Sequence, residues 1–390
     1  MLRDKLLIGI WVILLSTCIE VLSYFILPDV KLDKIDSILM ILEQEPVLFW
    51  KVRPHLNTEF QGVKVATNSL GFRNKEFTTK KEKNFYRIII LGASPSFGWG
   101  VNFEDTYSYL LEEKLSNDSL KKQVEVINAS QIGYTSYQGL ILLQNYLLKY
   151  SPDLVVIPYV LNDIDVYRFY RNEGLSDKEL SVPSHFLITL NNVIDRSRFV
   201  VVLKKIIKKF VNSNDNIAAS YLRKQFKLAK IRVSADDYQA NLLKIINICK
   251  ANNTEIILLK MPVNLSLPSL SNQENKILID GHSCSDFYYD LAQNYDKQRK
   301  FYQARFYYNK AREYKVIDCY IQSKVYHSIM DEVSKKMNVH LVDVDALFIK
   351  TGIYQELFNG PDDSIHPNSR GHEIIAEALR NIINSVFLKD

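Results

Sequence analysis

The sequence has few cysteines, little excess charge and a single long apolar run, and each shortage excludes a class of protein. Its four cysteines, at positions 18, 249, 284 and 319, form no Cys-x-x-Cys pair and no Cys/His pair at metal-ligand spacing. We therefore expect no structural zinc site and no disulfide framework, although one bridge among the last three stays open if the domain is exported. The net charge of +5 is too small to argue for nucleic acid. A hydrophobic share of 47% and a charged share of 24% exclude disordered, collagen-like and multi-span membrane proteins.

The small positive charge is unevenly distributed. Between Arg196 and Arg232 the chain has eleven lysines and arginines against one acid, Asp215. In this segment the spacing predicts an amphipathic helix with an apolar stripe on one side and lysines on the opposite side. The stripe is Phe199, Val202, Leu203, Ile206, Ile207 and Phe210, and the lysines are Lys204, Lys205, Lys208 and Lys209. The stripe is expected to cover the protein core with the lysines in solvent. Contact with an anionic bilayer or with an acidic glycan is an alternative.

The long apolar run lies at the N-terminus. Residues 6–27 are almost continuously apolar, and about 22 residues at a rise of 1.5 Å just cross a hydrocarbon layer of ~30 Å. Arg3 and Lys5 precede the run, whereas the charges after it cancel, so we expect a membrane anchor with a cytoplasmic N-terminus and everything after residue 27 outside. A cleaved signal peptide, a lipid-modified Cys18 and a buried soluble helix are the alternatives.

Five apolar, β-branched runs predict buried strands, at residues 87–91, 124–128, 154–159, 255–259 and 339–344. They lack strict alternation, as is typical of parallel strands that are covered on both faces. Helical patterns lie between them at residues 106–115, 136–150 and 237–250, and a last helix spans 370–387 behind Asn368 or Ser369. Alternating strands and helices predict an α/β fold, a doubly wound, mainly parallel five-stranded sheet flanked by helices.

Polar residues follow the carboxyl ends of these strands. Ser94 lies in a glycine-rich run after the first strand, Gly133 after the second and Asn162 after the third, and the pair Asp363 and His366 precedes the last helix. Ligands bind beyond the carboxyl ends of such sheets, so we expect these residues to meet there. Each has an ordinary structural explanation alone. Together they supply the nucleophile, base, acid and oxyanion donors that ester hydrolysis needs.

This ordered set resembles the SGNH (GDSL-type) hydrolase family. The resemblance covers roughly residues 68 to 387 with interruptions, and its four blocks stand in the family order. Residues 126–139, which begin Val-Ile-Asn-Ala-Ser, are similar to the second block, and Tyr-Ser-Pro-Asp at 150–153 is similar to the lead-in of the third. Asn-Ser-Leu-Gly-Phe-Arg at 68–73 resembles a segment that precedes the serine block in exported bacterial members.

The resemblance implies a role for each of the matched residues. Ser94 would be the nucleophile, His366 the general base, and Asp363 the acid that orients His366 and stabilises its imidazolium. The backbone N–H groups of Ser94 and Gly133 and the side-chain amide of Asn162 would bind the oxyanion, each donor contributing ~3 kcal/mol to transition-state stabilisation. No metal and no organic cofactor is implied.

Two positions depart from the family pattern. The acid that usually precedes the nucleophile is replaced by Ala93, and the glycine two residues before Asn162 is replaced by Val160, which alters local packing. Asp362 is the alternative acid, and His372 is interpreted as structural. A catalytically degenerate scaffold of the same fold is therefore the alternative to an enzyme.

A second insertion follows the fourth strand. Its residues Tyr288, Leu291, Ala292, Tyr295, Ala304, Tyr308 and Ala311 match the spacing of a tetratricopeptide repeat. A single repeat cannot bury its own faces, so we expect residues 285–316 to dock on the hydrolase domain as a helical hairpin, with a protein partner as a further possibility.

Taken together, the sequence predicts an anchor at 1–27, a lead-in segment at 28–84 and a hydrolase domain at 85–390 with insertions at 168–237 and 285–316. We expect a membrane-anchored serine esterase or acyltransferase that faces the exterior or the bacterial periplasm. Its substrate would be an ester, such as an O-acetyl group, of an envelope glycan or lipid. The alternative function is a non-catalytic envelope scaffold or partner-binding protein.

Overall fold

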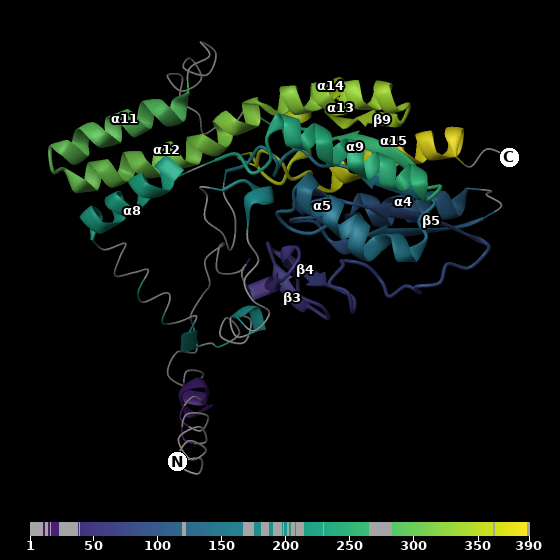
Figure 1. The fold of residues 1–390 in the computed structure, drawn as a ribbon, viewed down its shortest axis with the longest axis horizontal. Coiled ribbons are helices and arrows are strands. Elements are labelled where there is room, and N and C mark those ends of the chain that lie inside the picture. Colours follow the sequence, from purple (N-terminus) through teal and green to yellow (C-terminus); the bar gives the residue numbers. More distant parts are fainter. Residues whose placement is uncertain are drawn as a thin grey trace.

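A computed structural model of the chain describes residues 11, 15, 17–22, 38, 40–118, 122–166, 175–180, 187–189, 197, 199–200, 203, 207, 214–228, 230–264, 283–361 and 363–387. In this part of the chain a central sheet lies between two layers of helices, and a separate group of helices projects from one end of that body (Figure 1). No helix among the described residues is both long enough and apolar enough to span a membrane. Most of the predicted anchor, residues 1–27, lies outside the described residues.

The central sheet has five parallel strands in the order β6-β5-β7-β8-β9. The strands are β5 (Phe85–Ile90), β6 (Gln123–Asn128), β7 (Leu154–Ile157), β8 (Glu255–Lys260) and β9 (His340–Asp343). Successive residues of β5 alternate between two hydrophobic clusters, Ile88 and Ile90 packing on one face and Ile89 on the other, and all three are fully buried. The predicted α/β fold with a parallel five-stranded sheet is confirmed, and burial of both faces explains why the strands lack alternation.

Three helices cover each face of the sheet. α5 (Ser136–Leu142), α9 (Ala235–Ala251) and α13 (Ser323–Met337) pack on one face, and α4 (Tyr107–Asn117), α14 (Val344–Lys350) and α15 (Ser369–Val386) pack on the other. The single helix predicted at 136–150 is wrong in detail, because α5 continues as a π-helix at Leu143–Leu147 and a 3-10 turn at Leu148–Tyr150. Shorter helices are α3 (Ser94–Phe97) and the 3-10 turns η1 (Phe103–Asp105), η4 (Asp177–Glu179) and η5 (Tyr354–Leu357).

The lead-in segment forms two antiparallel hairpins that belong to the core. β1 (Leu42–Glu45) pairs with β2 (Phe49–Val52), and β3 (Asn57–Phe60) pairs with β4 (Val63–Ala66). Trp50 and Val52 are fully buried in the hydrophobic cluster that also contains α5 and α9. Phe60 and Val65 of the second hairpin are buried in the same cluster. The lead-in segment is therefore an integral part of the body that contains the central sheet, and not a linker.

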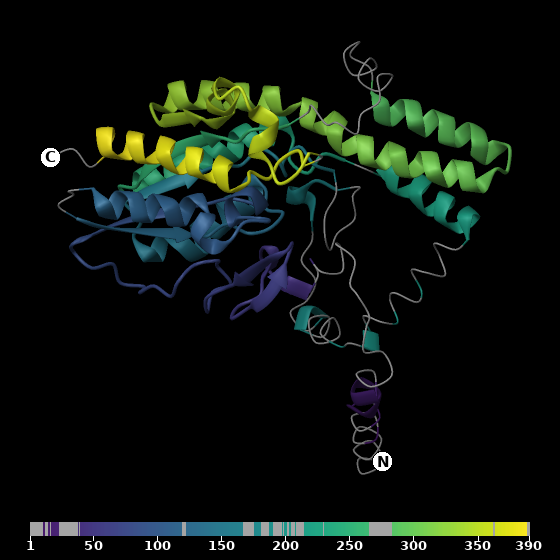
Figure 2. The same cartoon turned by 180° about the vertical axis from the view of Figure 1, so that it is seen from behind.

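The expectation that the second insertion docks on the hydrolase domain is wrong. Helices α11 (Cys284–Lys297) and α12 (Phe301–Ile321) pack against each other and against α8 (Asp215–Leu228). Both views show these three helices projecting away from the sheet (Figures 1 and 2). Ala219 and Leu222 of α8 bury Ala292, Ala304 and Tyr308 of the hairpin, so the first insertion supplies the apolar face that a lone repeat lacks.

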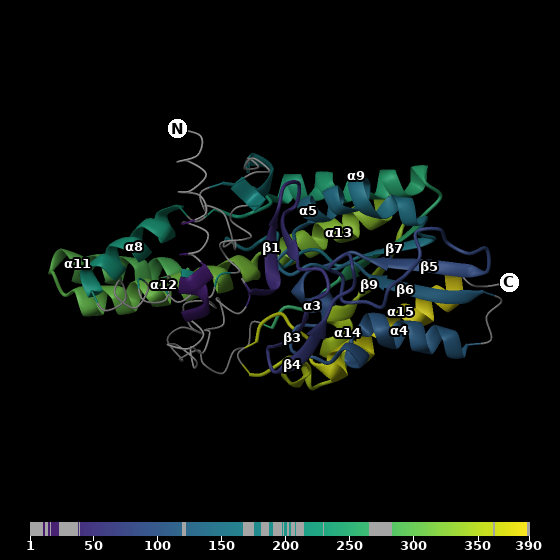
Figure 3. The ribbon, with the colours of Figure 1, turned by 90° about the horizontal axis from the view of Figure 1, so that it is seen from below.

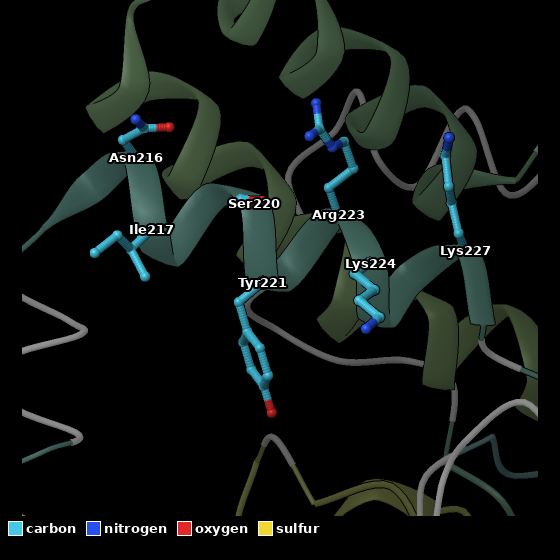
Figure 4. Close-up of a pocket in the computed structure, with 7 residues that line it drawn as sticks. All are labelled: Asn216, Ile217, Ser220, Tyr221, Arg223, Lys224 and Lys227. Carbon is cyan, nitrogen blue, oxygen red and sulfur yellow. The ribbon is translucent and has the colours of Figure 1, made fainter.

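Two ion pairs join α8 to the hairpin. Arg223 pairs with Asp296 and Arg305 pairs with Asp215, each at 2.8 Å. On the opposite side of α8, Ile217 and Tyr221 project away from the hairpin beside a surface hollow that Lys224 also lines (Figure 4). The resemblance to a tetratricopeptide repeat and a protein partner there stay predictions.

The described residues of the apolar stripe in the basic segment are exposed. Of its apolar stripe, Phe199, Leu203 and Ile207 are 40%, 42% and 55% exposed, whereas the remaining stripe residues and the four lysines lie outside the described residues. For these three residues, the interpretation of the stripe as a cover for the core is wrong. Near the start of the segment, the Ser197 hydroxyl donates to the Glu20 carboxylate at 2.7 Å, so the segment adjoins the helical residues 17–22.

Candidate active site

The candidate nucleophile begins a short helix directly after the first strand of the core sheet. Ser94 is the first residue of α3 and is 5% exposed (Figure 3). Pro95 in the first turn fits because its fixed φ is helical and its missing N–H has no role there. Gly92 lets the turn close, since a Cβ on it would lie 2.6 Å from the Ser96 side chain. The helix ends at Gly98, whose φ of 89° is left-handed.

Ser94, His366 and Asp363 form one hydrogen-bonded row. His366 Nε2 lies 3.0 Å from Ser94 Oγ, although 272 residues separate them in the sequence. On the other side of the ring, His366 Nδ1 lies 3.1 and 3.0 Å from the two carboxylate oxygens of Asp363. An ionised carboxylate only accepts, so Nδ1 carries the proton and Nε2 is free to accept the serine proton. The structure thus brings together the three residues that the sequence predicted, and their catalytic roles stay predictions.

The His366 side chain and the local backbone together keep Asp363 ionised. Burial opposes the charge, but hydrogen bonds from His366 and from the N–H groups of Ile365 and His366 outweigh it and lower the pKa of Asp363. Those two N–H groups donate to Asp363 Oδ1 at 3.0 and 2.8 Å. The three-residue spacing of Asp363 and His366 therefore forms a tight turn whose own backbone orients the acid.

Trp99 stacks on the imidazole of His366. The two rings lie 4.8 Å apart and only 13° from parallel, and Phe60 of β3 holds the indole edge-on at 4.9 Å. The Asn359 amide donates to the Trp99 carbonyl, and the Asn359 N–H donates to the His366 carbonyl at 2.9 Å. Sequence reasoning assigned no role to Trp99 or Asn359. Trp99 lies within the serine block, and that closeness was the one available signal.

Two of the predicted oxyanion donors, Gly133 and Asn162, lie on the loops after β6 and β7, the two strands that flank β5. Gly133 has a φ of 76°, a conformation that favours glycine, and Asn162 follows β7 with its side chain 8% exposed. Within the described residues, neither the Asn162 amide nitrogen nor the backbone N–H of Ser94 or Gly133 has a hydrogen-bond acceptor. Buried donors are normally paired, so three unpaired donors on the loops around Ser94 are unusual. Their role as an oxyanion site stays a prediction.

Backbone and amide hydrogen bonds hold these loops to the serine turn. The Gln131 N–H donates to the Gly92 carbonyl at 3.0 Å, and the Asn128 amide donates to the Ser96 carbonyl at 2.9 Å. Arg73 binds the C-terminal end of α3, where its guanidinium donates to the carbonyls of Gly98 at 2.6 Å and Val101 at 2.8 Å. Its burial lowers the pKa of Arg73 to about 10. The segment 68–73 therefore supports the serine helix.

Other titratable groups near the site have structural surroundings. His372 is fully buried, its Nδ1 accepts the Tyr107 N–H at 3.0 Å, and burial lowers its pKa to about 3, so it stays neutral, as expected for a structural histidine. Burial raises the pKa of Asp163 to about 7 while Ser136 donates to it. The alternative acid Asp362 lies outside the described residues. Val160 is packed in the core and Ala93 is 7% exposed beside Ser94.

Cys249 and Cys284 are buried in different hydrophobic clusters, and the Cys319 side chain lies outside the described part of the chain. Within that part, no group of three or more His, Cys, Asp or Glu side chains is arranged to hold a metal ion.

Comparisons with known proteins give structural likenesses alone. No protein-family model and no curated protein matches the sequence. Among solved structures, LAE5, an alpha/beta hydrolase enzyme from the metagenome of Lake Arreo, is 15% identical, with 78% of this chain and 97% of that chain covered and a TM-score of 0.40. The lipase/acylhydrolase from Enterococcus faecalis is 14% identical, with coverages of 78% and 98% and a TM-score of 0.41. Axe2, an acetylxylan esterase from Geobacillus stearothermophilus, is 13% identical, with coverages of 78% and 95% and a TM-score of 0.41. At this level the likenesses assign no activity to this chain.

Proposed function

We propose that this protein is a serine esterase or acyltransferase that acts through a covalent acyl-enzyme. The observation that carries the proposal is the row of Ser94, His366 and Asp363, with an Nε2–Oγ distance of 3.0 Å. A serine hydroxyl is a weak nucleophile until an adjacent base takes its proton, and a base acts well when a third group fixes its tautomer. Both conditions are met at this one site.

The proposed reaction has two balanced steps. Ser94 Oγ attacks the carbonyl carbon of the ester while its proton passes to His366 Nε2, and Asp363 stabilises the resulting imidazolium. The ester C–O bond breaks, and the leaving oxygen takes the proton from His366. Water or another hydroxyl then attacks the acyl-serine, gives its proton to His366, and releases Ser94 with that proton. The N–H groups of Ser94 and Gly133 and the Asn162 amide stabilise the oxyanion in both steps.

The first test is hydrolysis of simple chromogenic esters by the full chain. We expect turnover of p-nitrophenyl acetate and release of acetate from O-acetylated polysaccharide. An added sugar hydroxyl that takes up the acyl group at the expense of free acetate would identify transfer. A non-catalytic scaffold, the alternative function, predicts the background rate with every ester. Background rates under conditions in which a control serine esterase is active would contradict the proposal.

The substrate we propose is an O-acyl ester of an envelope glycan or lipid, met outside the cytoplasmic membrane. The proposal is supported by large apolar side chains that are exposed near the N-terminus. Trp11, Leu15 and Leu22 are 69%, 63% and 52% exposed. Phe199 and Ile207 are also exposed, and they belong to the basic segment that contacts Glu20 through Ser197. Exposed apolar groups gathered in one region are typical of membrane contact.

Extraction and protease accessibility test this location. In a bacterial host, we expect the full chain to stay with membranes after alkaline carbonate extraction, and we expect protease added to spheroplasts to digest the hydrolase domain. A variant with Arg3→Glu and Lys5→Glu loses the positive charge that sets orientation, and less of its domain should be accessible. Release of the chain by carbonate, or a domain that is protected in intact spheroplasts, would contradict the proposed location.

A further inference from the structure

A tryptophan of the lead-in segment hydrogen-bonds the peptide unit that carries one proposed oxyanion donor. Trp50 lies in β2, its side chain is fully buried, and its indole Nε1 donates to the Ile132 carbonyl oxygen at 2.8 Å. Ile132 immediately precedes Gly133. The contact joins residues 82 positions apart in the sequence, so the fold, and not local structure, places it there.

Peptide geometry gives this contact a consequence for Gly133. The Ile132 carbonyl and the Gly133 N–H belong to one planar unit, and the described residues contain no cis peptide bond. In a trans unit the carbonyl and the N–H point in opposite directions, so fixing one fixes the other. A hydrogen bond to the carbonyl also polarises the unit and strengthens its N–H as a donor. The indole hydrogen bond therefore fixes the direction of the Gly133 N–H and makes this N–H a stronger hydrogen-bond donor.

Two further contacts hold the indole and the neighbouring peptide unit. The Arg232 guanidinium lies 5.4 Å from the centre of the Trp50 ring and donates to the Gly133 carbonyl at 2.7 Å. An ion pair with the Asp177 carboxylate, 3.0 Å away, balances its charge. The Tyr134 hydroxyl donates to the Trp50 carbonyl. The carbonyls on both sides of the Gly133 Cα are thus fixed by buried side chains, while its N–H has no acceptor among the described residues.

We propose that Trp50 is a positioning residue for the oxyanion site, acting through the Ile132–Gly133 peptide unit. The inference rests on the proposed function and deepens it, because it gives the lead-in segment a role in orienting an oxyanion donor. Removal of the Trp50 indole should weaken stabilisation of the transition state and leave binding of the ground-state ester unchanged, because the oxyanion forms only as the reaction proceeds.

The test is Trp50→Phe in the full chain, a change that keeps an aromatic side chain and removes the N–H. We expect kcat for p-nitrophenyl acetate to fall about tenfold with KM within about twofold, a part of the loss that follows removal of a whole oxyanion donor. Affinity for a boronic acid, which forms a tetrahedral adduct with the serine, should fall by the same factor. If the phenylalanine variant fails to fold, benzothienylalanine at position 50 retains the bicyclic shape without the N–H.

The matched control is Thr254→Val, which removes a buried hydroxyl that donates to the Pro152 carbonyl at 3.0 Å, beside the first residues of β7 and β8 and not at the carboxyl ends of the strands. This control should retain kcat within about twofold. A wild-type kcat in the Trp50 variant, a rise in KM alone, or an unchanged boronate affinity would overturn the inference. Because Ser94→Ala tests the proposed function separately, activity that depends on Ser94 but not on the Trp50 N–H overturns this inference alone. Absence of wild-type turnover overturns both.

Discussion

Replacing Ser94 with alanine is expected to lower kcat for p-nitrophenyl acetate by at least ~10⁴-fold. The reason is that the Ser94 hydroxyl is the group that lies 3.0 Å from His366 Nε2, and an alanine cannot form an acyl-enzyme. Oxyanion donors and substrate binding survive the change, so a small rate above the uncatalysed reaction should remain. Steady-state hydrolysis at neutral pH measures the effect.

Ser130→Ala is the matched control for Ser94→Ala. Ser130 is a fully buried serine on the neighbouring loop, and its hydroxyl has no hydrogen-bond partner among the described residues. Its removal should leave kcat within about twofold, because no pairing is lost. Thermal unfolding of both variants shows whether either change acts through stability. Equal rates for the Ser94 variant and the wild type would show that another residue performs the chemistry.

Asp363→Asn should lower kcat by ~10⁴-fold with little change in shape. The carboxylate accepts the Nδ1 proton of His366 at 3.0 Å, whereas an amide that presents its NH₂ group would favour the tautomer that protonates Nε2. In that tautomer His366 cannot take the proton of Ser94. The loss should therefore appear in kcat, and the pH at which activity is highest should move upward as hydroxide replaces the missing base.

The pH dependence of the wild type carries a second expectation for Asp363. Its lowered pKa means that the carboxylate stays ionised throughout the neutral and mildly acidic range. Protonation of Asp363 therefore limits activity only below the ordinary aspartate pKa of about 3.9.

The control for Asp363→Asn is Asp345→Asn, which changes a carboxylate that accepts from the Tyr354 hydroxyl away from the row of Ser94, His366 and Asp363. Activity of the Asp363 variant equal to that of this control would contradict the assigned role.

The sheet and the catalytic row were predictable from the sequence for different reasons. Strands buried on both faces leave long apolar runs, such as residues 87–91 and 154–159, which few other structures produce. Ser94, Asp363 and His366 follow strands or precede a helix in an order that resembles a known family. The rule that parallel strands present their carboxyl ends together then predicted that they meet.

The supporting residues were not predictable in the same way. Trp50, Arg73 and Arg232 bind backbone carbonyls, and a carbonyl has no identity in the sequence. β1 to β4 have four residues each, too few for a periodic pattern to stand out. Pairing of such short strands depends on the body on which they pack.

The position of the helical hairpin was mispredicted because the sequence shows that an apolar face needs a partner and not which partner it meets. Two candidates were present, the hydrolase domain and the first insertion. The first insertion provides Ala219 and Leu222, small and medium-sized residues that match the alanines of α11 and α12. The apolar stripe predicted in that insertion lies at residues 199–210 and does not include Ala219 or Leu222.

Covalent labelling with a fluorophosphonate probe tests the central claim most directly, because only an activated serine reacts quickly with it. Mass spectrometry of the labelled full chain is predicted to show one adduct per molecule, on the peptide that contains Ser94. Labelling should be absent from the Ser94→Ala variant and retained in Ser130→Ala. No adduct on the wild type under conditions that label a control serine esterase, or an adduct on a different serine, would contradict the account.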